Sequence, residues 1–211
     1  MLPHTFVRGI GGGQRGVTLV VVLLILLVVT TVGIGAARIS LLGERSARFD
    51  RDYQVAFQSA EAALMDAEFD IFGPNSSSSA RLSTFNKENT VDFVSGCGTA
   101  GTQGLCEMNA TGLPIWYQVD FSATGTTAHT VEFGTFTGRD FDAATTTSSA
   151  GVKPARKPRY IIEVAVDRSA NTDATYNESK ASSKLYRVTS MGFGPREDIQ
   201  AVLQMTFKKE E

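Results

Sequence analysis

The segment Val17-TLVVVLLILLVVTTVGIGA-Ala37 contains no charged residue and is long enough to cross a bilayer as one helix. A Gly-rich, basic stretch that ends in Gln14-Arg15-Gly16 precedes it, and Arg38 is the first charge after it. A secretory signal peptide has a shorter apolar core, with its cleavage site beyond that core. Here the candidate cleavage site lies before the apolar segment, between Gly16 and Val17. Cleavage would therefore leave a membrane helix as the new N-terminus.

An ordinary single-pass anchor, never cleaved, has the same order of positive charge and apolar helix. Arg8 and Arg15 favour a cytoplasmic N-terminus, whereas Arg38, Arg45 and Arg48 on the other side weaken that bias. The apolar segment alone leaves both interpretations open. The residues that follow it favour a subunit that packs helix against helix.

The helix is expected to continue without a break from Ala36 to Gly73-Pro74, since Pro disfavours a helical conformation in the residue before it. Apolar residues recur every three or four positions, the period of one helix face. They are Ile39, Leu42, Phe49, Tyr53, Ala56, Phe57, Ala60, Leu64 and Ala67. We therefore expect a leader (1–16), a membrane or filament-core half of a helical spine (17–37) and an amphipathic half (38–73). A simple anchor does not need a spine of roughly 80 Å.

These segments resemble the PilX-type minor pilins of type IV pili. The resemblance rests on Gln14-Arg15-Gly16, on Ala37-RISLLGE-Arg45, on Ala56-FQSAEAA-Leu64 and on Tyr186-RVTSMGF-Gly194. It covers the first seventy residues and the last twenty-five, and we can assign no known motif to the middle of the chain.

The resemblance implies that prepilin peptidase cuts between Gly16 and Val17 and methylates the new amine of Val17. Major pilins begin with Phe or Met and carry a Glu at the fifth position, where this chain has Val21. The family is placed at or near the pilus tip, where it primes pilus assembly and supports adhesion and twitching motility. A K-type minor pseudopilin of type II secretion shares the missing Glu, but it usually carries a large helical insertion that this chain lacks.

The resemblance also implies partners and a location. Other minor pilins, the major pilin and a large tip adhesin are the expected partners in the filament. Before assembly, the subunit is expected in the inner membrane of a Gram-negative bacterium, with its C-terminal domain in the periplasm. Afterwards it belongs to the extracellular pilus.

Residues 74–211 form the expected globular domain, because segments with a period of two follow one another there. The expected strands are Ile115–Phe121, Thr130–Phe136, Tyr160–Val166, Lys184–Met191 and Ile199–Phe207. An antiparallel sheet that packs on the second half of the spine would bury their apolar faces. The sequence thus predicts an α+β fold of the type IV pilin kind, without indicating the order of the strands.

Cys97 and Cys106 are the only cysteines, and they lie in a Gly-rich segment. In an oxidising periplasm such a pair favours a disulfide, here one that ties a surface loop near residues 97–106. A metal would need further ligands, and His129 is the only histidine after Gly16.

The linker between residues 138 and 158 ends in a cluster of basic residues: Lys153, Arg156, Lys157 and Arg159. Such a cluster can contact DNA phosphates, lipid headgroups or an acidic partner pilin, and a DNA-uptake minor pilin is the alternative function that corresponds to the first. No aromatic residue alternates with these charges, and the net charge of the chain is −2. The sequence therefore favours a solvated loop, and nucleic acid is not an expected partner.

Motifs of catalysis and cofactor binding do not appear in the sequence. His129 has no nucleophile motif around it, and the chain has neither a P-loop nor a dinucleotide-binding Gly pattern. Asp167, Asn171, Asp173 and Glu178 offer the oxygen ligands that calcium prefers, but not at EF-hand spacing. We expect a structural protein without a cofactor, not an enzyme.

Overall fold

The computed structural model describes residues 16–75, 77–86, 91–109, 111–141, 151–166 and 184–209. The chain divides into two compact units, Met1–Arg48 and Phe49–Glu211, and each is described by itself. In the first unit, helix α1 begins at Val17 and its side chains are exposed throughout the apolar segment. Helix α1 (Val17–Phe72) ends in the second unit, at the boundary expected from Gly73-Pro74.

Gly73 closes the helix. Its φ of +70° lies in the left-handed region, and its N–H donates to the Phe69 carbonyl at 2.9 Å. This is the usual role of glycine just after a helix, because it has no Cβ to clash in that conformation. Lys209 Nζ also donates to the Ile71 carbonyl, at 3.1 Å, and satisfies one of the last carbonyls of α1.

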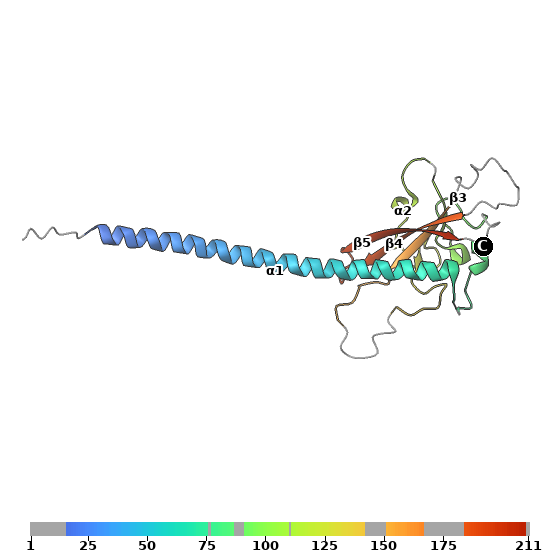
Figure 1. Ribbon diagram of the computed structural model, residues 1–211, viewed down its shortest axis with the longest axis horizontal. Coiled ribbons are helices and arrows are strands. Elements are labelled where there is room, and N and C mark those ends of the chain that lie inside the picture. Colours follow the sequence, from blue (N-terminus) through green and yellow to red (C-terminus); the bar gives the residue numbers. More distant parts are fainter. Residues whose placement is uncertain are drawn as a thin grey trace, which may run out of the picture. The chain divides into compact units, whose positions relative to one another are not determined.

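The described strands of the second unit form a five-stranded sheet. The strands are β1 (Leu105–Glu107), β2 (Val131–Glu132), β3 (Arg159–Val166), β4 (Lys184–Phe193) and β5 (Gln200–Lys209). The order is β1-β3-β4-β5, and β2 pairs with β3 beside β1. Strands β3, β4 and β5 lie across the second half of α1 (Figure 1). Two short helices, η1 (Leu82–Phe85) and η2 (Ala100–Thr102), lie between α1 and β1, and α2 (Ile115–Gln118) lies between β1 and β2.

The expected purely antiparallel sheet is wrong in one pairing. The pairs β2–β3, β3–β4 and β4–β5 are antiparallel, but β1 runs parallel to β3, with Cys106 opposite Glu163. The sheet is therefore mixed. The α+β, pilin-like fold is confirmed, with one long N-terminal helix and a sheet of several strands.

The three C-terminal strands lie where periodicity predicts them, but two earlier predictions are wrong. Instead of a strand over Ile115–Phe121, the chain forms α2, which follows Pro114 at its N-cap position. Of the strand expected over Thr130–Phe136, only β2 forms, since Gly134 turns the chain with a φ of +82°.

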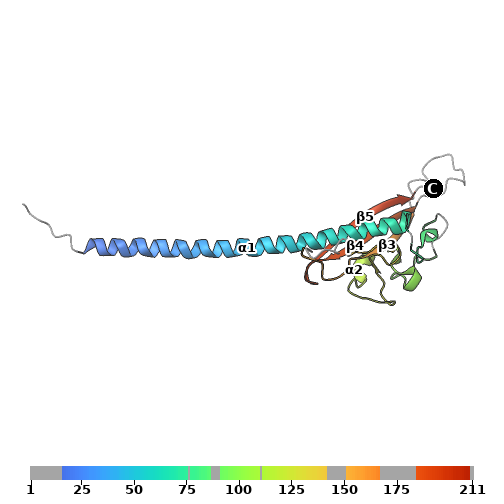
Figure 2. The ribbon, with the colours of Figure 1, turned by 90° about the horizontal axis from the view of Figure 1, so that it is seen from below.

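Apolar clusters lie on both faces of the sheet. On the α1 face, Tyr160 and Ile162 pack with Ala63, Leu64 and other core residues. On the opposite face, Ile161 packs with Ile115, Phe121 and both cysteines. Cys97 and residues 115–121 thus form a third layer over this face of the sheet. Figure 2 shows β5 along one side of the second half of α1 and α2 on the other.

The stripe expected on the spine is buried only in part. Within the second unit, Ala56, Ala60, Leu64 and Ala67 are buried, as its period predicts, whereas Phe49 remains exposed. Ile39 and Leu42, in the first unit, are exposed as well.

Candidate functional site

The predicted cleavage site, between Gly16 and Val17, lies at the start of α1. Gly16 is exposed and lies immediately before α1, of which Val17 is the first residue. Among the described residues, α1 is the one helix long and apolar enough to cross a membrane. No carboxylate lies between Val17 and Ala37, and Val21 occupies the fifth position after Gly16.

Two aspartates on successive turns of α1 connect the helix to the rest of the second unit. Asp66 and Asp70 are both buried. Asp66 accepts hydrogen bonds from the Gly134 N–H, at 2.8 Å, and from the Thr137 hydroxyl. Burial raises the pKa of the Asp66 carboxyl, while these two hydrogen bonds and the charge of Arg139 oppose the increase. Asp66 thereby fixes the loop that follows β2 against the helix.

Asp70 forms the centre of a second polar cluster. Arg81 donates to both of its carboxylate oxygens, with Nη2 at 2.7 Å from Oδ2, and the Tyr160 hydroxyl donates to Oδ2 at 3.0 Å. Burial raises the pKa of the Tyr160 phenol well above its usual value, and the nearby charge of Asp70 adds to the effect. Arg81 also donates to the Gln103 carbonyl and lies 3.7 Å from the ring centre of Phe136. A single carboxylate therefore joins α1, β3 and two loops.

Cys97 and Cys106 form a disulfide. Both cysteines are buried and Cys106 belongs to β1, whereas residues 99–101 of the loop that the bridge closes are exposed. His129 is exposed, and its Nδ1 lies 2.9 Å from the Cys97 carbonyl oxygen. The bridge holds the third layer on the sheet.

The basic cluster is not a free patch of charge. Arg159, the first residue of β3, is buried; it donates to Thr130 and lies 3.0 Å from Glu132 Oε2. Burial lowers the pKa of its guanidinium. Arg156 pairs with Glu197 at 2.8 Å and donates to the Ser122 carbonyl at 2.9 Å. For Arg159, the expectation of a solvated loop is therefore wrong.

The two remaining members of the cluster, Lys153 and Lys157, are exposed. Lys157 lies 4.0 Å from Glu132 Oε1. Glu132 of β2 and Glu197, in the turn before β5, thus neutralise much of the positive charge of the basic cluster. This arrangement does not favour contact with DNA phosphates.

Asp167, Asn171 and Asp173, the candidate calcium ligands, lie outside the described residues. In the ranges that the structure describes, no three acidic, cysteine or histidine side chains gather as metal ligands would.

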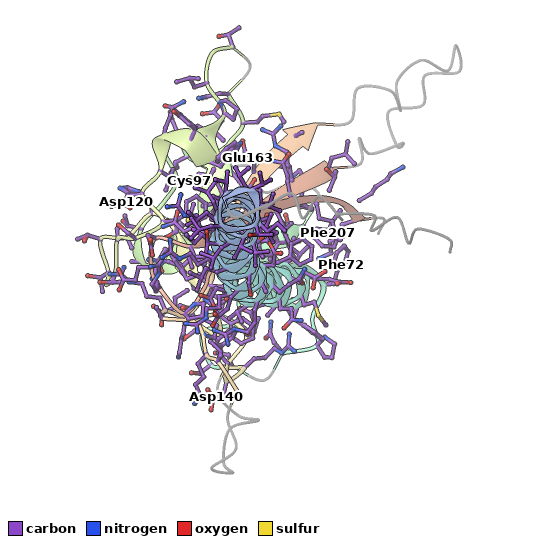
Figure 3. All side chains as sticks on the ribbon, turned by 90° about the vertical axis from the view of Figure 1, so that its left-hand side faces the viewer. Phe72, Cys97, Asp120, Asp140, Glu163 and Phe207 are labelled. Carbon is purple, nitrogen blue, oxygen red and sulfur yellow. A yellow bond between two sulfur atoms is a disulfide. The ribbon has the colours of Figure 1, made fainter. Side chains whose placement is uncertain are left out.

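Strand β5 is an edge strand. It pairs with β4 over ten residues, and no other strand in the described part of the chain pairs with it. Val202 and Met205 of β5 are each more than one third exposed. The strand therefore carries exposed apolar side chains as well as an edge that is not paired with another described strand. Phe207 packs edge-on against Phe72 of α1, with ring centres 5.9 Å apart. Figure 3 shows this pair on one side of the unit, with Cys97 and Asp120 on the other.

The buried aspartates and the role of residues 115–121 are not evident from the sequence. A signal for the aspartates exists, since Asp66 and Asp70 lie four residues apart beside the apolar stripe of the spine. It does not reveal partners that come from residues 81, 134 and 160.

Comparison with known protein families matches two family models to this chain. The model described as PilX N-terminal matches residues 15–64. The model described as Type IV pilus assembly protein PilX C-term matches residues 95–209, more than half of the chain. No curated protein and no solved structure matches the chain. The chain belongs to the PilX family of type IV pilus assembly proteins and is a type IV pilus minor pilin.

Proposed function

We propose that this minor pilin primes type IV pilus assembly and lies at or near the pilus tip, where it supports adhesion and twitching motility. The observation that carries the proposal is the apolar start of α1, which has no carboxylate from Val17 to Ala37. A buried carboxylate without a partner is costly. In a subunit that has no neighbour above it, a Glu at the fifth position would be buried without a partner. Val21 avoids this cost in free energy.

Processing precedes assembly in this account. Prepilin peptidase cuts between Gly16 and Val17 and methylates the Val17 amine. Before assembly the segment Val17–Ala37 holds the subunit in the inner membrane, with its C-terminal domain in the periplasm of a Gram-negative cell. The same segment then packs in the core of the extracellular filament. No step in this sequence requires a catalytic group of the chain itself, and we propose that it is not an enzyme.

The sheet supplies a surface for partners. Edge strands with unpaired backbone groups pair readily with a strand of another chain, and charged residues usually protect them. The two lysines of β5, Lys208 and Lys209, lie at its end, whereas Val202 and Met205 are exposed along its length. We propose that β5 contacts another pilus component: a minor pilin, the major pilin or a large tip adhesin.

The position in the filament is tested by stoichiometry. Sheared pili are separated by length, and the ratio of this chain to the major pilin is measured by quantitative mass spectrometry. A tip subunit occurs a fixed number of times per filament, so its ratio falls in inverse proportion to the mean length. A ratio that does not change with length would place the subunit along the shaft and overturn the tip position.

A further inference from the structure

Helix α2 forms one wall of a depression on the sheet face opposite α1. The depression has a volume of about 370 Å³ and is called the α2 pocket below. Its lining residues are Trp116, Tyr117, Val119, Asp120, Phe121, Ser122, Met191 and Gln200. The volume lies within the range of pockets that bind small ligands, which is roughly 300–1,000 Å³.

The aromatic wall exists because this segment is a helical turn. In a strand, Trp116 and Tyr117 would point to opposite faces. In α2 both rings line the same pocket, with centres 5.8 Å apart and planes at 86°. Tyr117 is 67% exposed, whereas Trp116 packs partly against the cluster around Ile115 and Phe121. One ring is therefore anchored and the other is open to solvent.

The polar groups of the pocket are held in place. The Asp120 carboxylate accepts hydrogen bonds from the Ser122 N–H at 2.7 Å and from the Ser122 hydroxyl at 2.6 Å. These bonds lower the pKa of Asp120, so its carboxylate is ionised at neutral pH. Arg156 fixes the Ser122 carbonyl and pairs with Glu197, and the Gln200 amide donates to the Glu197 carbonyl at 2.9 Å.

The α2 pocket suits a sugar. It presents two aromatic rings at nearly a right angle, and beside them a fixed carboxylate, an amide and a hydroxyl. The apolar C–H face of a pyranose packs on an aromatic ring, while its hydroxyls donate to a carboxylate and pair with an amide. Arg156 donates to the carbonyl of Ser122, the residue that holds Asp120, so a positive charge lies near this carboxylate and opposes a cationic ligand. We propose that the α2 pocket is a carbohydrate-binding site that takes a neutral glycan. This site shares only its lining residue Gln200 with β5, and it does not depend on the position of the subunit in the filament.

Trp116 is the only tryptophan of the chain, so its fluorescence reports on this pocket alone. The full chain is solubilised in a detergent without a sugar headgroup and titrated with cellobiose, lactose and N,N′-diacetylchitobiose. A glycan array then extends the search. We expect a saturable change in emission with at least one of these glycans, and saturation-transfer NMR signals from its C–H protons.

The variants Tyr117→Ala and Asp120→Asn should weaken that binding by about tenfold or more, since an aromatic anchor and a fixed acceptor are lost. Phe72→Ala removes a partly exposed aromatic ring at the far end of the sheet and should leave the affinity unchanged. The same thermal unfolding midpoint for Tyr117→Ala and for wild type excludes a folding defect as the cause.

Three results would overturn the proposal. The first is no binding to any glycan of the array. The second is a Trp116 response to choline with none to sugars, which would identify a cation site. The third is loss of a co-purifying pilus protein on Tyr117→Ala without any glycan response, which would make the α2 pocket a protein contact.

Discussion

Gly192 of β4 lies directly against Ala60 of α1: a methyl group on its Cα would overlap the Ala60 backbone nitrogen and the Ala56 carbonyl oxygen. Next to it, the Ser190 hydroxyl donates to the Ala60 carbonyl at 2.9 Å. The Gly residues of the C-terminal motif therefore allow the sheet to approach the helix closely, which gives this part of the family motif a physical role.

Substitution of Gly192 by Ala should destabilise the second unit by about 1–3 kcal/mol or more, because both groups that it would meet belong to the backbone and cannot rotate away. Urea unfolding of the full-length protein in detergent, followed by circular dichroism, measures this loss. Gly101→Ala is the matched control, since its Cβ would meet no atom within 4 Å. Equal stability of the two variants would contradict the close approach.

The Asp70–Arg81 pair should be far more sensitive to substitution than an exposed pair. Asp70→Asn leaves Arg81 charged and buried without its counter-ion, which costs about 3–5 kcal/mol. Glu44→Gln breaks the exposed Glu44–Arg48 pair of α1 and should cost within about 0.5 kcal/mol. Unfolding free energies of the two variants check the difference. If Asp70→Asn is as mild as Glu44→Gln, the polar cluster does not hold the unit together.

The buried Asp66 predicts a specific dependence of stability on pH. Its pKa in the folded chain lies above the ordinary value of 3.8, so its favourable contribution is complete below that value. The contribution decreases as the pH rises through the folded pKa, because the folded state must then bury a charge. Wild type should therefore lose stability relative to Asp66→Asn as the pH rises from about 3 to about 7. A constant difference, or one of opposite sign, would contradict the raised pKa.

Removal of the disulfide should destabilise the third layer. The double substitution Cys97→Ser and Cys106→Ser frees a loop of about ten residues, which costs roughly 2–3 kcal/mol by chain entropy. Because Cys106 is a buried residue of β1, we also expect hydrogen exchange of the β1 amides to increase before that of β4. Exchange that rises only in residues 97–104, with β1 unchanged, would mean that the bridge merely ties a loop.

Lysine substitutions along β5 should block its edge without unfolding the sheet. Val202→Lys with Met205→Lys places charges at two exposed positions and should change stability little, yet reduce the recovery of cross-linked pilus components with the full chain. Val152→Lys, at another exposed apolar position, should not affect this recovery. Unchanged recovery with the β5 variant would exclude this edge as the partner surface.

The sequence predicted the spine and the three C-terminal strands because each carries a sustained period. For α1 the apolar run and its stripe extend over many turns, and Gly73-Pro74 marks the end. Strands β3 to β5 alternate over eight to ten residues. Over such lengths a single period dominates the local preferences.

Short segments were not predictable in the same way. The seven residues from Ile115 to Phe121 alternate like a strand, but the first four of them form α2, and Ile115 and Phe121 pack in the apolar cluster that contains the disulfide. Strand β1 lies in a Gly-rich stretch and forms because it pairs with β3, which is distant in sequence. Arg159 belongs to a cluster for which the sequence predicts a solvated loop. In the fold it is buried, and Thr130 and Glu132 pair with its guanidinium. In each case a tertiary contact decided the outcome.

The function proposed above requires that this chain is processed and assembled as a pilin. Its most direct test is the intact mass and N-terminal sequence of the protein from membranes and from sheared pili, with and without prepilin peptidase. The account predicts a chain in sheared pili that begins at Val17 with an N-methylated amine, and an unprocessed chain in the peptidase mutant. The same unprocessed mass in both strains, with no protein in sheared pili, would contradict it and identify an ordinary membrane anchor.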